Sequence, residues 1–416
     1  MAGTDVMVLG AGMVGVATAL HLQKRGQAAV LIDRRGAGEE TSYGNTGIIQ
    51  REGVVPYPFP RDPGLILRYA FNRLPESHLH WRALPAIAPW LYRYWRASTP
   101  EAIAASSRGA RPLIERCVVE HETLMGEAGA LGLMRRTGYL RLYRSHPALD
   151  SAMLDDKAAS EAYGVNFEMV SAQGLGALEP HLKGNLAGAM FMPDPVSVSD
   201  PEAVTKAYAK LFQERGGRFA RGEAGTLSLT PRGWEVHTAG GPITAPAVVI
   251  ALGPWSSILF RRLGYRIPFG IKRGYHMHYR AEGNATLNRP VIDAEHGYAL
   301  TPMTRGIRLT TGAEFALRDA PATPVQLKRV EPLARQIFPL GERLDAEPWL
   351  GRRPCLPDML PAVGRGGRHN GLWFNFGHHH LGFTLGPVTG RLLAELMTGE
   401  TSFTDPTPYS PARFAS

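Results

Sequence analysis

The chain has 416 residues, which exceeds the length that one hydrophobic core usually serves, so two domains are expected. Hydrophobic residues make up 44% of it and charged residues 20%, and no apolar run reaches the roughly 18 residues of a membrane span, which excludes a membrane-spanning or disordered chain. The formal net charge is +9, but the basic residues are scattered, which favours an anionic ligand or an anionic membrane surface over nucleic acid as partner.

The first residues and the cysteines bear on the cellular compartment. Residues 1–12, MAGTDVMVLGAG, contain no basic region and no cleavage site typical of a secretory signal. Cys117 and Cys355 are the only cysteines, and they are too far apart for a disulfide framework or a metal-ligand cluster. The sequence therefore predicts a cytoplasmic protein and leaves open a peripheral attachment to the inner face of the membrane.

The first 33 residues predict a βαβ unit. A short apolar strand over 6–9 leads into the glycine-rich turn GAGMVG (10–15), a helix with an apolar stripe follows over 13–24, and a second strand covers 28–32. A glycine-rich turn between such a strand and such a helix is typical of a dinucleotide-binding site.

Each glycine of this turn has an expected role. Gly10 permits the tight turn, Gly12 lets the backbone approach a pyrophosphate, and Gly15 lets the helix pack closely against the strand. The phosphates would then face the positive N-terminus of the helix. Asp33, directly after the second strand, would accept a hydrogen bond from a ribose hydroxyl and disfavours a 2′-phosphate.

The segment GAGEETSYGNTGII (36–49) favours FAD over NAD as the dinucleotide. Small and polar residues directly follow the second strand, where a flavin enzyme passes its backbone along the second phosphate and the isoalloxazine. An NAD enzyme usually continues with another regular strand and helix. The residues in question are Glu40, Thr41, Ser42, Asn45 and Gly47.

The middle of the chain carries weaker patterns. Residues 53–100 are rich in Pro, Tyr and Trp, and we interpret the aromatic stretch 86–98 as core packing rather than as a lid. A helix is expected over 110–126, and the stretch 137–145 predicts a strand.

Clearer patterns follow from residue 200 onwards. Asp200 is the expected N-cap of a second crossover helix, with Pro201 at its first position. Residues 225–238 predict a hairpin, and APAVVIALGPWS (245–256) predicts a buried parallel strand that ends in a Gly-Pro turn. The short alternating strands over 268–317 are typical of an antiparallel sheet.

These patterns predict an α/β protein in which a Rossmann-like FAD-binding domain is interwoven with a substrate domain built on a mainly antiparallel sheet with helices. The FAD-binding domain would comprise residues 1–52, 196–262 and 346–416, and the substrate-binding domain residues 53–195 and 263–345. Ligand chemistry should lie where the two domains meet.

Two C-terminal segments complete the pattern. WLGRRPCLPDMLPAVG (349–364) is too rich in proline for a helix or a central strand, yet it carries two adjacent arginines, a cysteine and an aspartate. In FNFGHHHLGFTLGPVTGRLLAELMTG (374–399), Gly377 and Gly382 lie on either side of a turn, and a helix is expected over 387–397. This helix would direct its positive N-terminus at the pyrimidine ring of a flavin.

In their order and near their spacing, five motifs resemble the D-amino acid dehydrogenase branch of the D-amino acid oxidase and glycine oxidase superfamily. They are GAGMVG (10–15), ETSYGNTG (40–47), VVIALGPWS (248–256), RRPCLPDMLPAVG (352–364) and the segment 374–399. The resemblance is close at both ends and around 200–275, and it is vaguer over 53–195.

The resemblance implies roles for the proline-rich segment. In the family, the arginine directly before the proline of a G-x-R-P motif holds the substrate carboxylate, which implies this role for Arg353, and a planar, bidentate guanidinium suits it. Arg352 would face away or form a salt bridge, and Asp358 would cap or orient the turn. In sarcosine oxidase relatives a cysteine near the position of Gly351 binds the flavin covalently. Cys355 is therefore out of register, and non-covalent FAD is expected.

The resemblance also implies that His378 contacts substrate or flavin, and that Tyr275 and Tyr298 line the substrate site, although each tyrosine is equally well explained as an ordinary strand residue. Three adjacent histidines do not predict a metal site, because consecutive side chains point apart and no further ligand follows at metal spacing. The expected cofactor-binding residues are Gly10, Gly12, Met13, Val14, Gly15, Asp33, Arg34, Thr41, Ser42, Asn45, Gly47, Gly253, Gly377, His379 and Gly382.

The activity that the resemblance implies is FAD-dependent oxidative deamination of an amino acid, with D-amino acids as the first candidates. Hydride would pass from the amine-bearing carbon to flavin N5, and the resulting imine would hydrolyse to a 2-oxo acid. The electron acceptor would be a quinone, an electron-transfer protein or oxygen. A glycine or sarcosine oxidase, a secondary-amine dehydrogenase acting on a proline derivative, and a non-catalytic FAD-binding subunit remain open alternatives.

Overall fold

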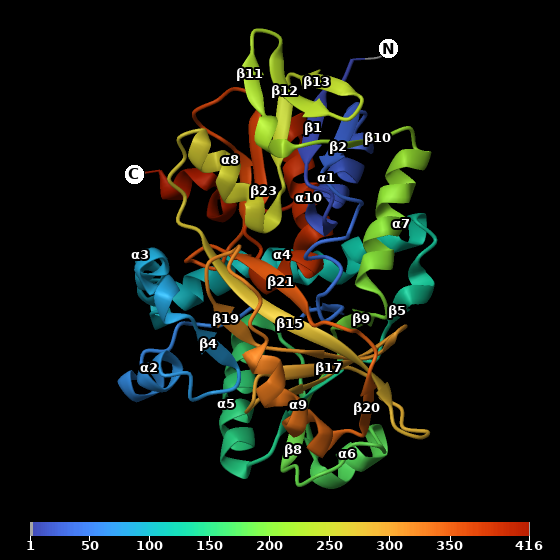
Figure 1. Cartoon of the computed structure of the whole chain (residues 1–416), viewed down its shortest axis with the longest axis vertical. Helices are drawn as coiled ribbons and strands as arrows, with labels where there is room; N and C mark the ends of the chain where they lie inside the picture. Colours follow the sequence, from blue (N-terminus) through green and yellow to red (C-terminus); the bar gives the residue numbers. More distant parts are fainter. Residues whose placement is uncertain (1–2, 416) are drawn as a thin grey trace.

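Two large sheets organise the protein, whose computed structural model describes residues 3–415 (Figure 1). The smaller of them has six strands, of which the first five run parallel and the last antiparallel. In spatial order they are β10 (Arg218–Arg221), β2 (Ala29–Asp33), β1 (Val6–Leu9), β14 (Ala247–Ile250), β23 (Leu372–Phe376) and β22 (Ala362–Arg365).

The larger sheet has eleven strands and is mainly antiparallel. Its spatial order is β4 (Ser77–Leu79), β19 (Ala313–Phe315), β15 (Gly270–Ala281), β18 (Gly306–Thr310), β17 (Tyr298–Met303), β16 (Val291–Asp293), β6 (Tyr139–Tyr143), β8 (Gly188–Met192) and β7 (Glu168–Ser171). Two further strands, β20 (Leu340–Arg343) and β21 (Trp349–Cys355), pair with the other side of the long strand β15.

Two three-stranded sheets and ten α-helices complete the fold of residues 3–415. The small sheets consist of β11 (Ser228–Thr230), β12 (Gly233–Thr238) and β13 (Gly241–Ala245), and of β3 (Ile48–Ile49), β9 (Val196–Val198) and β5 (Met134–Arg135). The helices are α1 (Met13–Gln23), α2 (Pro63–Ala70), α3 (Leu84–Arg96), α4 (Pro100–Glu127), α5 (His146–Tyr163), α6 (Ala172–Leu178), α7 (Pro201–Glu214), α8 (Ser256–Arg262), α9 (Val325–Ile337) and α10 (Gly382–Thr398).

Strand β1 shows how the six-stranded sheet is buried on both faces. Val6 and Val8 belong to the core that α1, α4, α7 and α10 form on one face, whereas Met7 and Leu9 belong to the core with β12 and α8 on the other. Successive side chains of a strand point to opposite faces, so a parallel strand between two layers is apolar at every position.

Glycines let α1 and α10 cross at close range. A Cβ atom at Gly386 would lie 2.7 Å from Cγ of Met13, and one at Gly390 would lie 2.8 Å from the amide nitrogen of Thr18. The C-terminal helix is thereby held against the first turn of the N-terminal helix, which closes the six-stranded layer from both ends of the chain.

The predicted α/β fold class, the N-terminal βαβ unit and the buried strand after the hairpin are confirmed. Two helices begin earlier than predicted. Helix α4 begins at Pro100 rather than at residue 110, because Thr99 caps it by accepting a hydrogen bond from the amide of Ala102. Helix α10 begins at Gly382 rather than at residue 387, and Pro387 lies inside it.

An internal proline is tolerated in α10 because the carbonyl that it leaves free finds another donor. Pro387 has no N–H to donate to the carbonyl four residues earlier, that of Phe383. The Nε2 atom of His121 on α4 bonds this oxygen instead, at 2.8 Å. A contact between residues 262 positions apart thus decides where the helix begins.

The proline-rich segment forms an edge strand. Residues of β21 pair with β15 from Gly270 opposite Cys355 to His276 opposite Trp349, so Pro354 lies on a strand with one free edge. The expected FAD-binding range 346–416 therefore starts with a strand of the larger sheet. We propose the two large sheets as the centres of the two domains, with this boundary near residue 355 instead of 346.

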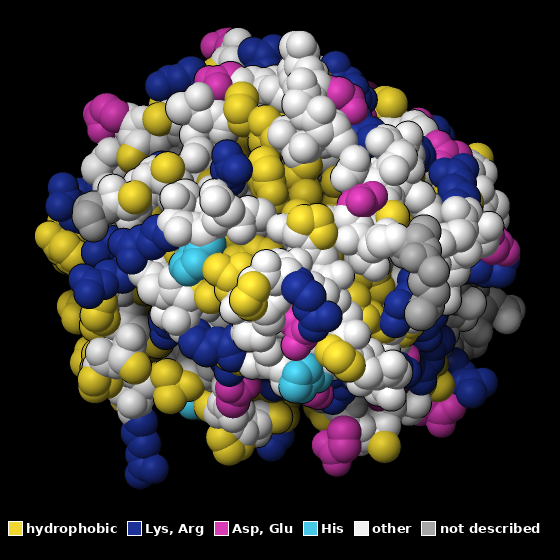
Figure 2. All heavy atoms as spheres, turned by 90° about the horizontal axis from the view of Figure 1, so that it is seen from above, with side chains coloured by type: hydrophobic (Ala, Val, Ile, Leu, Met, Phe, Trp, Pro, Cys, Tyr) yellow, Lys and Arg dark blue, Asp and Glu magenta, His cyan; other side chains and the backbone are white. Residues whose placement is uncertain are grey.

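The surface agrees with scattered rather than clustered charge. Figure 2, which views the molecule from the end with β11–β13, shows lysine and arginine side chains distributed around the rim and a strip of hydrophobic side chains in the hollowed middle. Among residues 3–415, no helix is both long enough and apolar enough to cross a membrane.

Candidate active site

A cavity of about 1020 Å³ lies where the two large sheets meet. The six-stranded sheet lines it with Gly10 and residues 12–14 and 251–255, and the larger sheet lines it with Lys272 and residues 274–275, 310–313 and 351–355. Such a shared cavity between two layers is where a cofactor and a substrate can be held together.

The glycine-rich turn explains its own composition. Gly10 has a φ of +109°, and a Cβ atom there would lie 2.5 Å from the carbonyl oxygen of Ala251 on the neighbouring strand. A Cβ atom at Gly15 would lie 1.8 Å from the carbonyl oxygen of Gly10. Any side chain at Gly10 or Gly15 would therefore clash with the backbone, so these two positions require glycine. Gly10 and Gly12 line the cavity, whereas Gly15 lies behind them.

Asp33 and Ser42 hold the turn in place. Asp33 accepts a hydrogen bond from the amide of Ala11 at 2.7 Å and one from the amide of Arg35 at 2.9 Å, and Ser42 Oγ accepts one from the amide of Met13 at 2.9 Å. Asp33 lines the cavity at the end of β2 and keeps acceptor capacity for a ribose hydroxyl. These residues fit the adenosine and pyrophosphate of a dinucleotide.

The loop after β2 is held by its own polar side chains. Asn45 donates to the carbonyl of Ser42 at 2.9 Å and accepts from the amide of Gly47 at 2.8 Å. Thr41 donates to the carbonyl of Arg352 at 3.2 Å, which ties the loop to β21. Thr41, Ser42 and Asn45 line the cavity, whereas Gly47 has a φ of +70° and packs behind it, where a Cβ atom would lie 2.6 Å from the carbonyl oxygen of Val198.

Arg34 and Gly253 lie at the same end of the cavity. Arg34 pairs with Glu40 at 3.0 Å, and its guanidinium lies 4.7 Å from the ring centre of Trp255. Gly253 has a φ of +51° and begins the short 3-10 turn that carries this tryptophan. Met13 and Val14, at the start of α1, complete this wall.

Arg353 carries a positive charge into the cavity without an acidic partner. Its Nη1 atom donates to the carbonyl of Gly312 at 2.7 Å and its Nη2 atom to the carbonyl of Thr311 at 3.2 Å, and none of the ion pairs within residues 3–415 includes it. Burial lowers the pKa of Arg353 below its ordinary value. Two backbone carbonyls thus fix the guanidinium, and its charge remains uncompensated inside the molecule.

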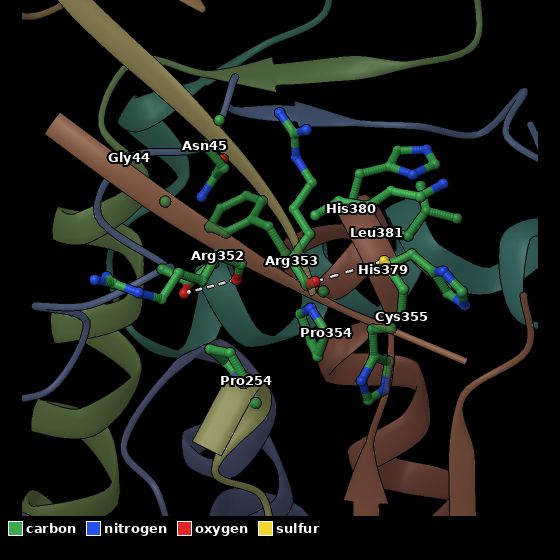
Figure 3. Close-up of a pocket in the computed structure, with 18 of the residues that line it drawn as sticks. Gly44, Asn45, Pro254, Arg352, Arg353, Pro354, Cys355, His379, His380 and Leu381 are labelled. Carbon is green, nitrogen blue, oxygen red and sulfur yellow. Dashed lines mark hydrogen bonds between the residues drawn. The ribbon is translucent and has the colours of Figure 1, made fainter. Parts of the chain in front are cut away.

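Arg352 leaves β21 in a different direction from Arg353 (Figure 3). Its Nε atom donates to the carbonyl of Arg318 at 2.9 Å, and its guanidinium lies 5.9 Å from the ring centre of Trp255. In the described part of the chain it forms no ion pair. Asp358, by contrast, does form one, with Arg413 near the C-terminus at 2.6 Å.

The two tyrosines expected at the substrate wall have buried hydroxyl groups with protein partners. Tyr275 donates to the Glu314 carboxylate at 3.0 Å and accepts from the amide of Thr323 at 2.8 Å. Tyr298 accepts from Nη2 of Arg144 at 3.3 Å. Both residues line the cavity, but these hydroxyl groups are engaged within the protein, so each tyrosine can contribute a surface rather than a reacting group.

The three histidines meet three different environments. His378 lines the cavity and is buried, the hydroxyl of Thr389 lies 3.0 Å from its Nε2 atom, and burial lowers its pKa to about 3. His379 has a φ of +55°, and burial lowers its pKa as well. The His380 ring lies 5.3 Å from that of Tyr57, and burial lowers its pKa to about 3, with Arg353 and Lys272 adding to the effect. All three are neutral at physiological pH.

The turn around these histidines joins the two sheets. Gly377 has a φ of +87°, and a Cβ atom there would lie 2.6 Å from the Leu356 side chain, while Gly382 lines the cavity at the start of α10. The backbone of His378 pairs with that of Cys355. Figure 3 shows His379, His380 and Leu381 beside the end of β21, so the N-terminus of α10 borders the same cavity as Arg353.

A group of possible metal ligands lies elsewhere and was not singled out from the sequence. His276, His278 and Asp345 bring their ligand atoms within 4.8 Å of one another. The His278 ring is already bonded to Asp345 at 2.7 Å and to the guanidinium of Arg308 at 3.0 Å. The guanidinium of Arg308 beside these nitrogens disfavours a metal cation at the same place. That the three adjacent histidines, residues 378–380, bind no metal stays a prediction.

Sequence reasoning missed one wall of the cavity. Tyr57, Tyr69 and Glu76 line it, and Tyr57 has 65% of its surface exposed. They come from residues 53–76 of the proline- and aromatic-rich segment, to which no role in the site was assigned, whereas Trp90 and Tyr94 of the stretch 86–98 are buried in a small core cluster. The signal available was the mixture of tyrosines and acids in a segment without a regular period.

Comparison with known proteins agrees with this geometry. The model of the DAO family, described as "FAD dependent oxidoreductase", matches residues 5–396. A D-amino acid dehydrogenase of Methylobacterium sp. (strain 4-46) is 32% identical over 410 residues, 95% of each chain, and a D-amino-acid oxidase of Bradyrhizobium diazoefficiens is 29% identical over 99% of each chain. The crystal structure of glycine oxidase from Geobacillus kaustophilus superposes with a TM-score of 0.75 over 98% of each chain, at 22% identity. The chain belongs to the DAO family of FAD-dependent oxidoreductases, as its motifs suggested.

Proposed function

We propose that this protein oxidises D-amino acids at the carbon that bears the amine. The substrate would lose a hydride from this carbon and a proton from its nitrogen, and water would convert the imine to a 2-oxo acid and ammonia. FAD, when bound, supplies the hydride acceptor, N5 of its isoalloxazine ring. The names of the relatives quoted above support D-amino acids as the substrate class.

One observation carries the proposal. Arg353 lines the same cavity as the dinucleotide turn, and it brings a charge that no acid within residues 3–415 neutralises. A buried guanidinium without a partner is costly unless a ligand supplies the anion, and a carboxylate matches its planar geometry in a bidentate manner. The α-carboxylate of an amino acid is such a ligand.

The chain's own residues would act mainly by orientation. Arg353 would fix the carboxylate, and Tyr275 and Tyr298 would form the wall against which the rest of the substrate rests. The histidines next to the cavity are neutral, so none of them holds a proton that it would donate near neutral pH. Catalysis would therefore rest on the direction in which the C–H bond is held, with the substrate bound as the free amine.

Non-covalent attachment of FAD is part of the proposal. Gly351 occupies the position where the resembling sarcosine oxidases carry their flavin-binding cysteine. A Cβ atom there would lie 2.5 Å from the ring of Trp349, so this position has no room for a side chain as the strand is built. Cys355 is buried, and burial raises the pKa of its thiol, which disfavours the reactive thiolate.

Anaerobic flavin bleaching tests the proposal. The purified holoprotein is mixed without oxygen with a panel of D-amino acids, their L-enantiomers, N-methyl amino acids and proline, and the visible flavin absorbance is followed. We expect loss of the oxidised spectrum with D-amino acids. Bleaching by L-amino acids or secondary amines alone would refute the substrate class, and no bleaching by any compound would indicate a non-catalytic FAD-binding subunit. Reoxidation by oxygen, compared with a quinone, then identifies the acceptor.

A further inference from the structure

Glu76 presents a buried carboxylate oxygen that has no partner. One oxygen, Oε1, accepts a hydrogen bond from the hydroxyl of Tyr69 at 3.0 Å. The other, Oε2, is buried and bonds to nothing in the described chain, and none of the ion pairs within residues 3–415 includes this residue. Glu76 and Tyr69 both line the cavity. A carboxylate held in this way costs free energy unless a ligand supplies the missing donor.

Glu76 and Arg353 lie on either side of one glycine. The Arg353 guanidinium donates to the carbonyl of Gly312, and the next residue, Ala313, donates from its amide to the carbonyl of Glu76 at 2.8 Å. A Cβ atom at Gly312 would lie 2.1 Å from the carbonyl oxygen of Glu76. An unpaired cation and an unpaired anion thus border one cavity, with the backbone link between β18 and β19 between them.

Two arginines of the cavity wall are compensated by acids, whereas Lys272 is not. Arg144 pairs with Asp293 at 2.9 Å, and Arg141 pairs with Asp156. The ammonium of Lys272 lies 2.9 Å from the Tyr94 hydroxyl and 4.1 Å from the centre of its ring, so aromatic groups stabilise it without an acid. The cavity lining therefore includes an ammonium that aromatic groups partly satisfy and a carboxylate with one unpartnered oxygen, and the latter favours a cationic over an acidic ligand group near Glu76.

The cavity that Glu76 lines has room for a long side chain. Helix α5 contributes small residues, Ala148, Ser151 and Ala152, to the lining of the same cavity, followed by Asp155. Asp155 is exposed and forms no ion pair within residues 3–415, so it adds negative potential at the rim. A flexible chain ending in a positive charge would find room along the small residues and complementary charge at both positions.

We propose that Glu76, oriented by Tyr69, binds the positive end of the substrate side chain, and that the substrates are amino acids with an ammonium or guanidinium group at that end. This proposal rests on the function proposed above. Arg353 would hold the α-carboxylate and Glu76 the distal cation, so that the two contacts together set the position of the carbon between them. The pair of contacts also excludes acidic side chains, which Glu76 repels.

The test compares D-lysine with D-norleucine, which has the same carbon chain without the terminal amine. The rate of anaerobic flavin reduction is measured against substrate concentration for the parent, for Glu76→Gln and for Glu115→Gln. Glutamine keeps the size and the acceptor for Tyr69 but removes the charge. Glu115 is an exposed residue paired with Arg111 on α4, outside the cavity, so it is a matched control.

We expect the parent to prefer D-lysine and D-arginine over D-norleucine. In Glu76→Gln, the second-order rate constant for the two basic substrates should fall roughly 30-fold or more while that for D-norleucine changes less than about threefold, as loss of one buried charge pair implies. Glu115→Gln should behave as the parent. A parent that reduces with D-norleucine as readily as with D-lysine would overturn the inference without any variant, and so would an equal loss for both substrates in Glu76→Gln. If no amino acid bleaches the parent, it is the proposed function that fails.

Discussion

Arg353 donates from Nη1 to the main-chain oxygen of Gly312 at 2.7 Å. The guanidinium reaches this oxygen by passing over Gly274, where a Cβ atom would lie only 2.7 Å from Nη2. The link between β18 and β19, without any acidic side chain, thus holds the charge at a fixed place in the cavity. An arginine held by backbone carbonyls is ready to receive a carboxylate from outside, because no internal anion has to be displaced first.

This relationship predicts how substitutions at Arg353 act. Arg353→Met should lower the rate constant for flavin reduction at low substrate concentration by an amount equivalent to about 2–5 kcal/mol, the cost of losing a buried charge-assisted pair. Arg353→Lys should recover only part of the loss, because an ammonium cannot reproduce the bidentate geometry. The measurement is the rate of anaerobic flavin reduction against substrate concentration, with the flavin spectrum as a check on folding.

Arg352→Met is the matched control on the same strand. Its guanidinium donates to the carbonyl of Arg318 and approaches Trp255, so its removal should affect reduction far less. If flavin reduction is impaired in Arg352→Met but normal in Arg353→Met, Arg352 and not Arg353 binds the substrate carboxylate. If both variants resemble the parent, the substrate carboxylate is bound elsewhere.

The flavin should leave the protein when the protein is denatured. Trichloroacetic acid precipitation of the yellow holoprotein is expected to leave essentially all of the flavin in the supernatant, because Gly351 has no side chain and Cys355 is a buried thiol. Absorbance of the supernatant and of the redissolved pellet measures the two fractions. Flavin that stays with the pellet would show a covalent bond and would contradict the expected non-covalent attachment.

Asp33 should govern FAD affinity more than turnover. Asp33→Ala removes the acceptor of the Ala11 amide within the glycine-rich turn, together with the expected ribose contact. The loss of such hydrogen bonds costs about 1–3 kcal/mol, so the dissociation constant of FAD should rise roughly tenfold or more, as titration of the apoprotein would show. The reduction rate of the remaining holoprotein should stay near that of the parent, because the adenosine end is remote from the reacting carbon. Unchanged FAD affinity would mean that the glycine-rich turn and Asp33 do not form the FAD site.

The N-terminal βαβ unit could be predicted because steric contacts with the backbone require its glycines. The contacts that require Gly10 and Gly15 lie within a few residues or on the adjacent parallel strand, so the motif and its neighbours carry the whole signal. The fold class followed from the same local patterns. The adjacent arginines were located from a motif, but their surroundings were not, because those depend on which strands pair with β21.

The wall that contains Glu76 could not be found from local patterns. Glu76 reaches the cavity because Ser77, the next residue, pairs in parallel with Ala313, a strand more than 200 residues away in the sequence. The start of α10 was missed for a similar reason, since the donor that satisfies Phe383 lies on another helix. In both cases a tertiary contact between distant segments decides the local structure, and periodicity does not record it.

His121 should make the protein sensitive to acid. It is buried, its Nε2 atom bonds the Phe383 carbonyl, and burial lowers its pKa to about 4 from an ordinary value of 6.5. Between these two values the unfolded chain binds a proton that the folded chain does not, so the free energy of unfolding falls as the pH decreases through this window. This one residue should contribute about 2 kcal/mol of the loss between pH 7 and pH 5. Urea unfolding of the FAD-saturated protein at both pH values measures it.

His121→Phe should be destabilised at pH 7 by about 1–3 kcal/mol, because the carbonyl that Pro387 leaves free loses its donor, but it should lose less stability than the parent on acidification. The exposed His237→Gln should keep the pH dependence of the parent. An unchanged pH dependence in His121→Phe would show that this histidine is not the buried neutral group that holds the start of α10.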